Sequence, residues 1–298
     1  MTQGTNVATN FLSRVRHRYH PFHRLKKNRF ISAQLMPRLD RPLWRRLYGI
    51  GWPVRLRLMR HLSYIIDNRT VEPGVAALFE AVCDGLKPDV FWDVGANIGL
   101  YSWLVLTRRA EARAVLFEPD PENLAMISAT KERSNIKRAE IIAVAAADKE
   151  GVLEFILDQV SGFTGGLDLA QETYVGTHYG LQQRRIQVPA LTLDACLVNH
   201  PAPGFVKIDV EGAEHLVFAG AKRLLEDVRP VLIFECAPEN FPALTGRLNQ
   251  LDYQLFSAEE PETDVAGAPN ILALPAGGAL EAGQLMVAWH GRMKDWKG

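Results

Sequence analysis

From residue 72 onward, short apolar runs and longer amphipathic segments alternate along the chain. The apolar runs are rich in Val, Ile, Leu and Phe and have the length of buried strands. The segments between them place apolar residues at helical spacing. The predicted strands are residues 89–94, 113–118, 139–146, 151–157, 185–190, 204–209, 230–235, 252–257 and 270–274. The predicted helices are residues 73–85, 98–107, 121–133, 192–199, 213–225 and 239–250. This alternation predicts an α/β fold whose parallel sheet is covered on both faces.

A glycine-rich string, Asp93-Val94-Gly95-Ala96-Asn97-Ile98-Gly99, joins the predicted strand 89–94 to the next helix. Gly95 and Gly99 allow a sharp backbone turn and the close approach of a ligand. The N–H groups of a helix N-terminus beside such a turn favour an anionic group. We therefore expect a nucleotide-type cofactor here, although an ordinary α/β turn would share this pattern.

A carboxylate, Glu118, ends the strand predicted at 113–118. A carboxylate accepts hydrogen bonds and can bind both hydroxyls of a ribose, so Glu118 is the predicted ribose ligand. A dinucleotide site would prefer Gly-x-Gly-x-x-Gly, but the spacing here is Gly95-x-x-x-Gly99. This spacing, and the lack of a Tyr-x-x-x-Lys pair, disfavour an NAD-type oxidoreductase, which is the alternative enzyme class.

A second string, Lys207-Ile208-Asp209-Val210-Glu211-Gly212-Ala213-Glu214, follows the predicted strand 204–209. Alternation along a strand would put Lys207, Asp209 and Glu211 on one face. Three buried charges are costly unless they pair with one another or with a ligand. This cost favours a functional role, whereas Glu214 in the first turn of the next helix is mainly structural.

Five motifs give the chain a specific resemblance, which spans about residues 88–275. They are the two strings above, Phe117-Glu118-Pro119, Ala146-Ala147-Asp148 and Thr192-Leu193-Asp194. In this order they resemble the motifs of the FkbM family of S-adenosylmethionine-dependent methyltransferases. The resemblance implies a Rossmann-like class I methyltransferase fold, with a mostly parallel seven-stranded sheet and an antiparallel edge hairpin. It also implies O-methylation of a hydroxyl on a glycan, lipid-linked saccharide or related natural product.

For S-adenosyl-L-methionine, we expect the loop of Asp93, Gly95, Asn97 and Gly99 to hold the methionine end. Glu118 would bind the ribose. Asp148 could accept a hydrogen bond from the adenine amino group, with Asn135 and Asp120 as weaker candidates; a turn or cap role for Asp148 is equally plausible.

A hydroxyl acceptor needs a base that takes its proton. Asp209 and Glu235, at the ends of predicted strands, are the leading candidates, and Lys207 would hold the carboxylates in place. Asp209 would also lie nearest the cofactor's sulfonium. His178 is a third candidate for the base, although a lone His in a polar loop is usually solvated.

The segment 158–184 interrupts the regular pattern with glycines and aromatic residues. Loops of this length often act as lids or binding loops, so we expect acceptor contacts here. The candidate residues are Ser161, Thr164, Tyr174, His178 and Tyr179.

No metal is expected. Catechol-type methyltransferases would require an Asp-Asn pair where the chain has Phe234-Glu235-Cys236. The chain has 3 cysteines, none in a Cys-x-x-Cys pair, which indicates neither zinc nor a disulfide framework.

Charge divides the chain, whose formal net charge is zero, into a basic arm and an acidic body. Residues 1–60 contain 14 Lys or Arg and one acid, Asp40. We predict a basic, partly helical extension over 1–66 and a methyltransferase domain over 67–298. Residues 41–66, with Trp44, Leu47 and Tyr48 at helical spacing, are expected to pack on the core.

Residues 11–30 form either a solvated arm or a surface that contacts anionic membranes. The second hypothesis for the whole chain is an inactive methyltransferase-like protein that binds membrane or nucleic acid through this arm, although the acidic body disfavours nucleic acid. No run reaches the roughly 20 apolar residues of a membrane span, and no secretory pattern begins the chain, so we expect a cytoplasmic protein. The sequence does not determine the oligomeric state.

Overall fold

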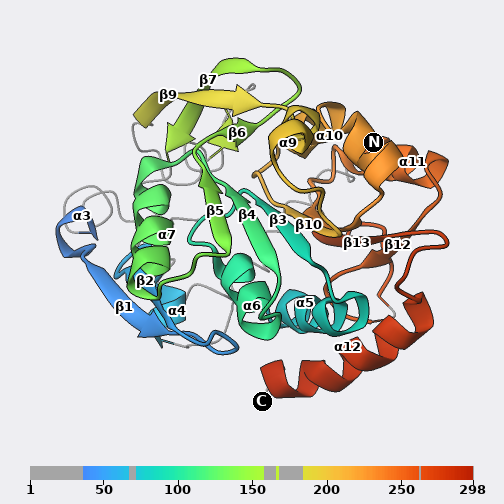
Figure 1. Ribbon diagram of the computed structural model, residues 1–298, viewed down its shortest axis with the longest axis horizontal. Coiled ribbons are helices and arrows are strands. Elements are labelled where there is room, and N and C mark those ends of the chain that lie inside the picture. Colours follow the sequence, from blue (N-terminus) through green and yellow to red (C-terminus); the bar gives the residue numbers. More distant parts are fainter. Residues whose placement is uncertain (1–35, 67–71, 158–165, 168–183, 262, 298) are drawn as a thin grey trace, which may run out of the picture.

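The computed structural model describes residues 36–66, 72–157, 166–167, 184–261 and 263–297. In this part of the chain, seven strands form a central sheet in the order β12-β13-β11-β10-β3-β4-β5 (Figure 1). Every neighbouring pair is parallel except those that involve β13. The strands are β3 (Val90–Val94), β4 (Arg113–Phe117), β5 (Ala139–Ile142), β10 (Phe205–Ile208), β11 (Val231–Glu235), β12 (Tyr253–Ser257) and β13 (Asn270–Pro275).

The chain order reverses between β3 and β10. Strands β3, β4 and β5 follow one another toward one edge, and β10 and β11 then continue on the other side of β3. The antiparallel pair β12 and β13 completes the second edge. The Rossmann-like fold and the edge hairpin predicted from the sequence are confirmed. Ligands in such sheets bind at the carboxyl ends of the strands beside this reversal.

Successive residues of each central strand face opposite layers. In β3, Phe91 belongs to one buried cluster, while Trp92 and Val94 belong to the other. The first cluster includes residues of α5 (Pro73–Leu86), α6 (Leu100–Arg108), α7 (Pro121–Arg133) and α12 (Ala282–Lys297). The second includes residues of α9 (Leu193–Asn199), α10 (Glu214–Ala219) and α11 (Phe241–Gln250). These continuous apolar strands are what a sheet covered on both faces requires.

A second, smaller sheet has the order β6-β9-β7-β8, and it lies at the end of the molecule opposite α12 (Figure 1). Its strands are β6 (Ala145–Ala146), β7 (Gly151–Leu157), β8 (Gly166–Leu167) and β9 (Arg184–Leu191). The single strand predicted over 139–146 is therefore wrong. Its first half, β5, pairs with β4, whereas β6 leaves the main sheet to pair with β9.

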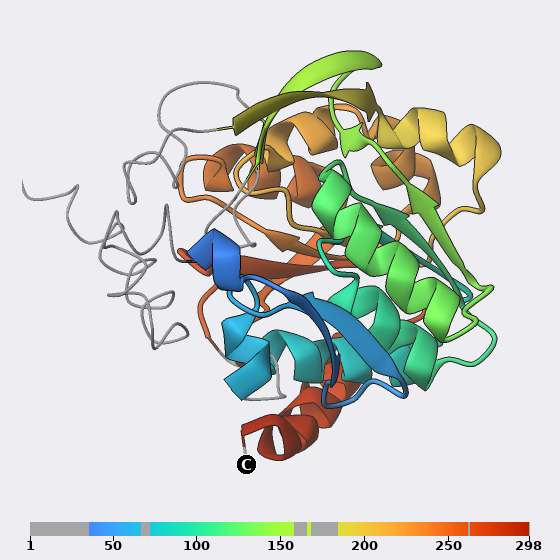
Figure 2. The same ribbon diagram turned by 90° about the vertical axis from the view of Figure 1, so that its left-hand side faces the viewer.

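Residues 36–66 form α3 (Met36–Leu39), an antiparallel hairpin of β1 (Pro42–Arg46) and β2 (Pro53–Arg57), and α4 (Leu62–Ile66). The helical spacing of Trp44, Leu47 and Tyr48 was misleading, because Trp44 lies on a strand and the other two follow it. Packing on the core is confirmed, since Val54 and Leu56 are fully buried in the first cluster. Figure 2 shows the hairpin in front of the helical layer, beside α7.

Ion pairs fix this extension to α7. Glu122, in the first turn of α7, lies 3.3 Å from Arg57 and 3.0 Å from Arg60. Buried Asp40 also pairs with Arg57 at 2.7 Å. The described part of the extension is thus part of the same folded unit as the sheet.

Two helical features differ from the sequence prediction. The helix predicted over 213–225 ends at Ala219, and a short π-helical turn follows at Leu224–Val228. The carboxylate of Asp194 accepts hydrogen bonds from the N–H groups of Arg223 and Leu224, which starts this new turn. The C-terminal helix α12 was not predicted, and its Trp289 indole donates to the carbonyl of Gly74 at 2.9 Å.

Among the residues that the structure describes, no helix combines the length and apolar character needed to cross a bilayer.

Candidate active site

The two sequence strings meet at the carboxyl ends of β3 and β10. The N–H of Asp209 donates to the carbonyl of Val94 at 3.0 Å. Gly95 has a φ of +78°, and a Cβ there would lie 1.8 Å from the carbonyl oxygen of Asp209. Gly95 is therefore required by the neighbouring protein loop, whereas the sequence had suggested the approach of a ligand.

The loop after β3 ends at the start of α6. Gly99, with a φ of +77°, precedes α6 and provides no side-chain cap. Asp93 fastens the helix to the strand instead, because its Oδ2 accepts from the Ser102 N–H at 3.2 Å and from the Ser102 hydroxyl at 2.7 Å. Its other oxygen, Oδ1, is buried without a hydrogen-bond partner among the described residues. Burial raises the pKa of Asp93, and the charge of Lys207 opposes that shift.

Glu118 follows β4 and links its end to the glycine loop. The side chain is only 4% exposed. Its Oε2 accepts from the Asn97 N–H at 2.7 Å and its Oε1 from the Asp120 N–H at 2.8 Å. Burial raises the pKa of Glu118 to about 8. The structure thus brings the predicted ribose ligand beside the loop that was predicted to hold the rest of the cofactor.

Lys207 is a buried cation at the point where the strand order reverses. Its Nζ lies 2.8 Å from Asp209 Oδ2 and 5.0 Å from the centre of the Tyr101 ring. Burial lowers the pKa of Lys207, but the carboxylates of Asp209, Asp93 and Glu72 outweigh it, so the pKa lies above the usual value. Lys207 therefore carries its charge and neutralises part of this acidic centre.

Asp209 also belongs to a cluster of three carboxylates. Ligand atoms of Asp209, Glu211 and Glu235 lie within 4.8 Å of one another, which is close enough to share a metal ion. Glu211 reaches this position through a turn with a φ of +54°, because β10 ends at Ile208 and the predicted alternation does not continue. The expectation that no metal is required stays a prediction, and Lys207 already supplies Asp209 with a positive charge.

Two acids at the starts of helices have mainly structural partners. Glu214 is fully buried, and its Oε1 accepts from the Val210 and Gly212 N–H groups, as expected for a structural acid. Burial raises its pKa to about 7. Asp120 caps α7 by accepting from the Glu122 N–H at 2.7 Å.

The adenine candidates lie in different places. Asp148 is exposed in a bend that follows β6, and its role stays a prediction. Asn135 follows the C-terminus of α7, just before β5, and this junction belongs to the edge of the sheet opposite Glu118. Asn135 is therefore not near Glu118 and the glycine-rich loop. His178 and the other candidates between 158 and 184 named above lie outside the described residues.

Four polar residues that the sequence analysis missed form a hydrogen-bond network that reaches Lys207 through the Tyr101 ring. The Tyr101 hydroxyl donates to Glu72 Oε2 at 3.0 Å. The Asn270 amide donates to Glu72 Oε1 at 3.3 Å and to Glu259 Oε1 at 2.9 Å. Burial raises the pKa of Glu72, and it raises that of Glu259 to about 7. Glu72 and Asn270 are 198 positions apart, so no local pattern could have predicted their contact.

The fold and the site together define a class of protein. A parallel sheet reverses its order beside a glycine-rich loop, a buried carboxylate follows the second strand, and further acids follow β10 and β11. This is the arrangement of a Rossmann-like methyltransferase.

Comparison with known sequences gives the family. Residues 93–255 match the Methyltransferase FkbM domain, which is more than half of the chain. The chain belongs to the FkbM methyltransferase family, and the resemblance carried by its five motifs is confirmed.

Individual relatives are distant. The hexuronic acid methyltransferase AglP of Haloferax volcanii is 25% identical over 196 residues, which cover 64% of this chain and 73% of that protein. The crystal structure of methyltransferase FkbM from Methylobacillus flagellatus KT shares 18% identity and a TM-score of 0.44, over 62% of this chain and 43% of that one. The chain thus spans less than half of that structure. Precorrin-6y C5,15-methyltransferase from Geobacter metallireducens GS-15 shares 13% identity and a TM-score of 0.38, over 63% and 80% of the two chains.

Proposed function

We propose that this methyltransferase uses S-adenosyl-L-methionine to methylate a hydroxyl of a glycan, lipid-linked saccharide or similar polyhydroxylated acceptor. The observation that carries the proposal is that two groups of polar residues meet at the carboxyl ends of the central strands β3, β4 and β10. Glu118 lies against the glycine loop on one side, and the pair of Lys207 and Asp209 lies against the same loop on the other.

The residues at this edge fit the proposed cofactor. Glu118 offers a buried carboxyl group to ribose hydroxyls. Its pKa is raised to about 8, and its ionised form is the stronger hydrogen-bond acceptor. Asp93 offers a buried oxygen that lacks a hydrogen-bond partner among the described residues, which suits an amino group. The N-terminus of α6 suits a carboxylate. When bound, S-adenosylmethionine supplies a methyl group on a positively charged sulfur.

The acidic side chains suit the second half of the reaction. A hydroxyl becomes a good nucleophile only as it loses its proton, and a positioned carboxylate can take that proton. Asp209 and Glu235 are the two candidates, and they share one cluster with Glu211. Lys207 pairs with Asp209 and holds that carboxylate in place, and the negative charge of Asp209 favours the positive sulfur.

The acceptor class follows from charge and from the relative. AglP is named for a hexuronic acid, which offers both hydroxyls and a carboxylate to a methyl donor. The three clustered carboxylates repel the carboxylate of an acceptor but accept hydrogen bonds from its hydroxyls. We therefore infer that a hydroxyl is methylated.

The test has a binding step and a transfer step. Calorimetry of the whole chain with S-adenosylmethionine, S-adenosylhomocysteine and NAD should give micromolar binding of the first two alone. Transfer of labelled methyl groups should then be measured on glucuronic acid and on glucose, a pair that differs only at C6, which is a carboxylate in the first and a hydroxymethyl group in the second. A product that survives mild base is an ether formed on a hydroxyl, whereas a base-labile product is an ester.

Each outcome decides one part of the proposal. Ether formation supports it, and ester formation overturns the hydroxyl assignment. If neither methyl-cycle ligand binds, the cofactor assignment is wrong, and the hypothesis of an inactive methyltransferase-like protein gains support.

A further inference from the structure

Tyr101 contacts the charged centre through the face of its ring. It lies in the first turn of α6, eight residues after Asp93, and is only 6% exposed. The Lys207 ammonium lies 5.0 Å from the ring centre, and it lies 2.8 Å from Asp209 Oδ2. A desolvated ammonium is attracted to the face of an aromatic ring. Lys207 is therefore held from two sides.

The Tyr101 hydroxyl is fixed as well. It donates to Glu72 at 3.0 Å, and Glu72 is in turn held by the Asn270 amide. Glu72 precedes α5 and Asn270 begins β13, so two further elements fix the end of the Tyr101 side chain. The negative charge of Glu72 also acts on Lys207 directly.

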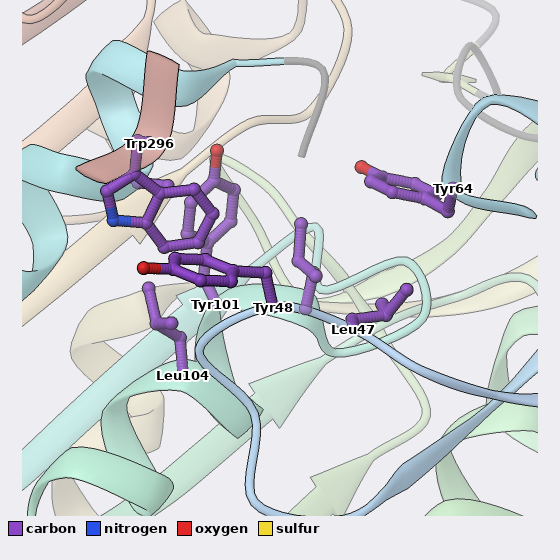
Figure 3. Close-up of a pocket in the computed structure, with 8 residues that line it drawn as sticks. Leu47, Tyr48, Tyr64, Tyr101, Leu104 and Trp296 are labelled. Carbon is purple, nitrogen blue, oxygen red and sulfur yellow. The ribbon is translucent and has the colours of Figure 1, made fainter. Parts of the chain in front are cut away.

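The rest of the Tyr101 ring is packed by aromatic and aliphatic side chains. Phe79 stacks on it with ring centres 4.3 Å apart. Figure 3 shows Tyr101 and Leu104 at a small cavity with Leu47, Tyr48 and Tyr64 from the N-terminal extension and with Trp296 from α12. The Trp296 ring meets the Tyr48 ring edge-on at 4.8 Å.

The cavity residues of the extension and of α12 lie outside residues 93–255, the segment that matches the family domain. They are Leu47, Tyr48, Tyr64 and Trp296. Residues of the N-terminal extension and of α12 therefore line the same cavity as Tyr101 and Leu104 of α6.

We propose that Tyr101 is a positioning residue whose ring face holds the Lys207 ammonium against Asp209. The effect on catalysis rests on the proposed function, because Asp209 is there expected to favour the positively charged sulfur. The contact between Tyr101 and Lys207 does not depend on that function.

The first experiment measures the contact itself. The whole chain is labelled with ε-¹³C lysine, and the Lys207 signal is assigned with Lys207→Arg. A CH₂ group held near a ring face is shifted upfield by the ring current. We expect this shift in the wild type and in Tyr101→Phe, and its loss in Tyr101→Leu.

The matched control is Tyr253→Leu. Tyr253 is also buried, and its ring lies 5.2 Å from the Arg229 guanidinium, on another part of the sheet. This variant should leave the Lys207 signal unchanged. An unshifted Lys207 signal in the wild type, or a shift that persists in Tyr101→Leu, overturns the proposal. If Tyr101→Leu does not fold, an altered Lys207 signal in the ring-conserving Tyr101→Phe has the same consequence.

The second experiment compares two ligands that differ in charge. S-adenosylmethionine carries a positive sulfur and S-adenosylhomocysteine does not. In Tyr101→Leu, the ammonium is no longer held against Asp209 and screens the charge of that carboxylate less. The affinity for the charged ligand should rise at least threefold relative to the neutral one, with the wild-type ratio kept in Tyr101→Phe and in Tyr253→Leu.

The two experiments separate the two proposals. A normal ligand ratio in Tyr101→Leu, together with a lost ring-current shift, overturns the catalytic part of the positioning role. If the wild type binds neither ligand, the proposed function fails, while the Lys207 signal still decides whether Tyr101 holds the lysine.

Discussion

Gly95 joins the two halves of the site, and substitution by alanine should separate them. The added Cβ would lie 1.8 Å from the Asp209 carbonyl oxygen and 2.8 Å from its carbon. Real Cβ atoms essentially never approach within 3.0 Å, so the two loops must part by at least 1.2 Å, the difference between 3.0 and 1.8 Å. Gly95 also has a φ of +78°, which disfavours any residue with a Cβ.

The magnitude has two parts. The left-handed conformation costs about 1–2 kcal/mol in an alanine. Forcing extra atoms into a packed site costs about 1–3 kcal/mol more. Together they lower the free energy of unfolding by about 2–5 kcal/mol, which for a domain of roughly this size lowers Tm by about 4–20 °C.

The matched control is Gly212→Ala in the neighbouring loop. Gly212 has a φ of +98°, but a Cβ there would meet nothing within 4 Å. An alanine at position 212 therefore has the cost of the left-handed backbone conformation but no steric clash with a neighbouring loop. Thermal unfolding of both variants, with calorimetry of S-adenosylhomocysteine, should show Gly95→Ala to be the less stable and to have lost binding by at least tenfold. Equal stability and equal binding in the two variants would refute the argument from loop contact.

Three further predictions concern charge. The pKa of Glu118 rises from 4.5 to about 8, so between these pH values the folded chain holds a proton that the unfolded chain has lost. Stability without ligand should therefore fall from pH 5 to pH 8, and affinity for S-adenosylhomocysteine should rise. Glu118→Gln should reduce the slope of both pH profiles in unfolding and calorimetric titrations, while Glu214 and Glu259 keep their share of the stability profile. It should also weaken binding about tenfold or more; unchanged slopes would contradict the assignment. Asp209→Asn should lower methyl transfer about 10²-fold or more while changing S-adenosylhomocysteine affinity little, and full turnover would remove Asp209 from the mechanism. Dialysis against EDTA should leave methyl transfer unchanged, whereas a loss restored by Mg²⁺ would assign a cation to Asp209, Glu211 and Glu235.

Much of the fold was predictable because its signals are local. Strand-length apolar runs and helical periods gave the alternation of strands and helices from α5 to β13. The errors occurred where tertiary contacts override local preference. Trp44, Leu47 and Tyr48 have helical spacing, but residues 42–46 pair with 53–57 as a strand. The predicted strand 139–146 divides because its two halves pair with strands of different sheets.

The candidate site was predicted to a similar extent. Parallel strands align their carboxyl ends, so acids that follow predicted strands were expected to gather at one edge. Glu118, Asp209 and Glu235 could be selected on that basis, and Lys207 by its alternation with Asp209. Asn135 could not be excluded, because the sequence alone does not show that the C-terminus of α7 belongs to the opposite edge.

The sequence by itself determined the class of the protein, because glycines at a strand-to-helix turn and carboxylates after strands are local features with a direct chemical meaning. The tertiary structure decided how these features act on one another. Gly95 is required by the Asp209 carbonyl, and Lys207 is held by Tyr101 as well as by Asp209. Glu72 meets Asn270 across 198 positions. Such contacts depend on the order in which the strands assemble, which no local pattern of residues specifies.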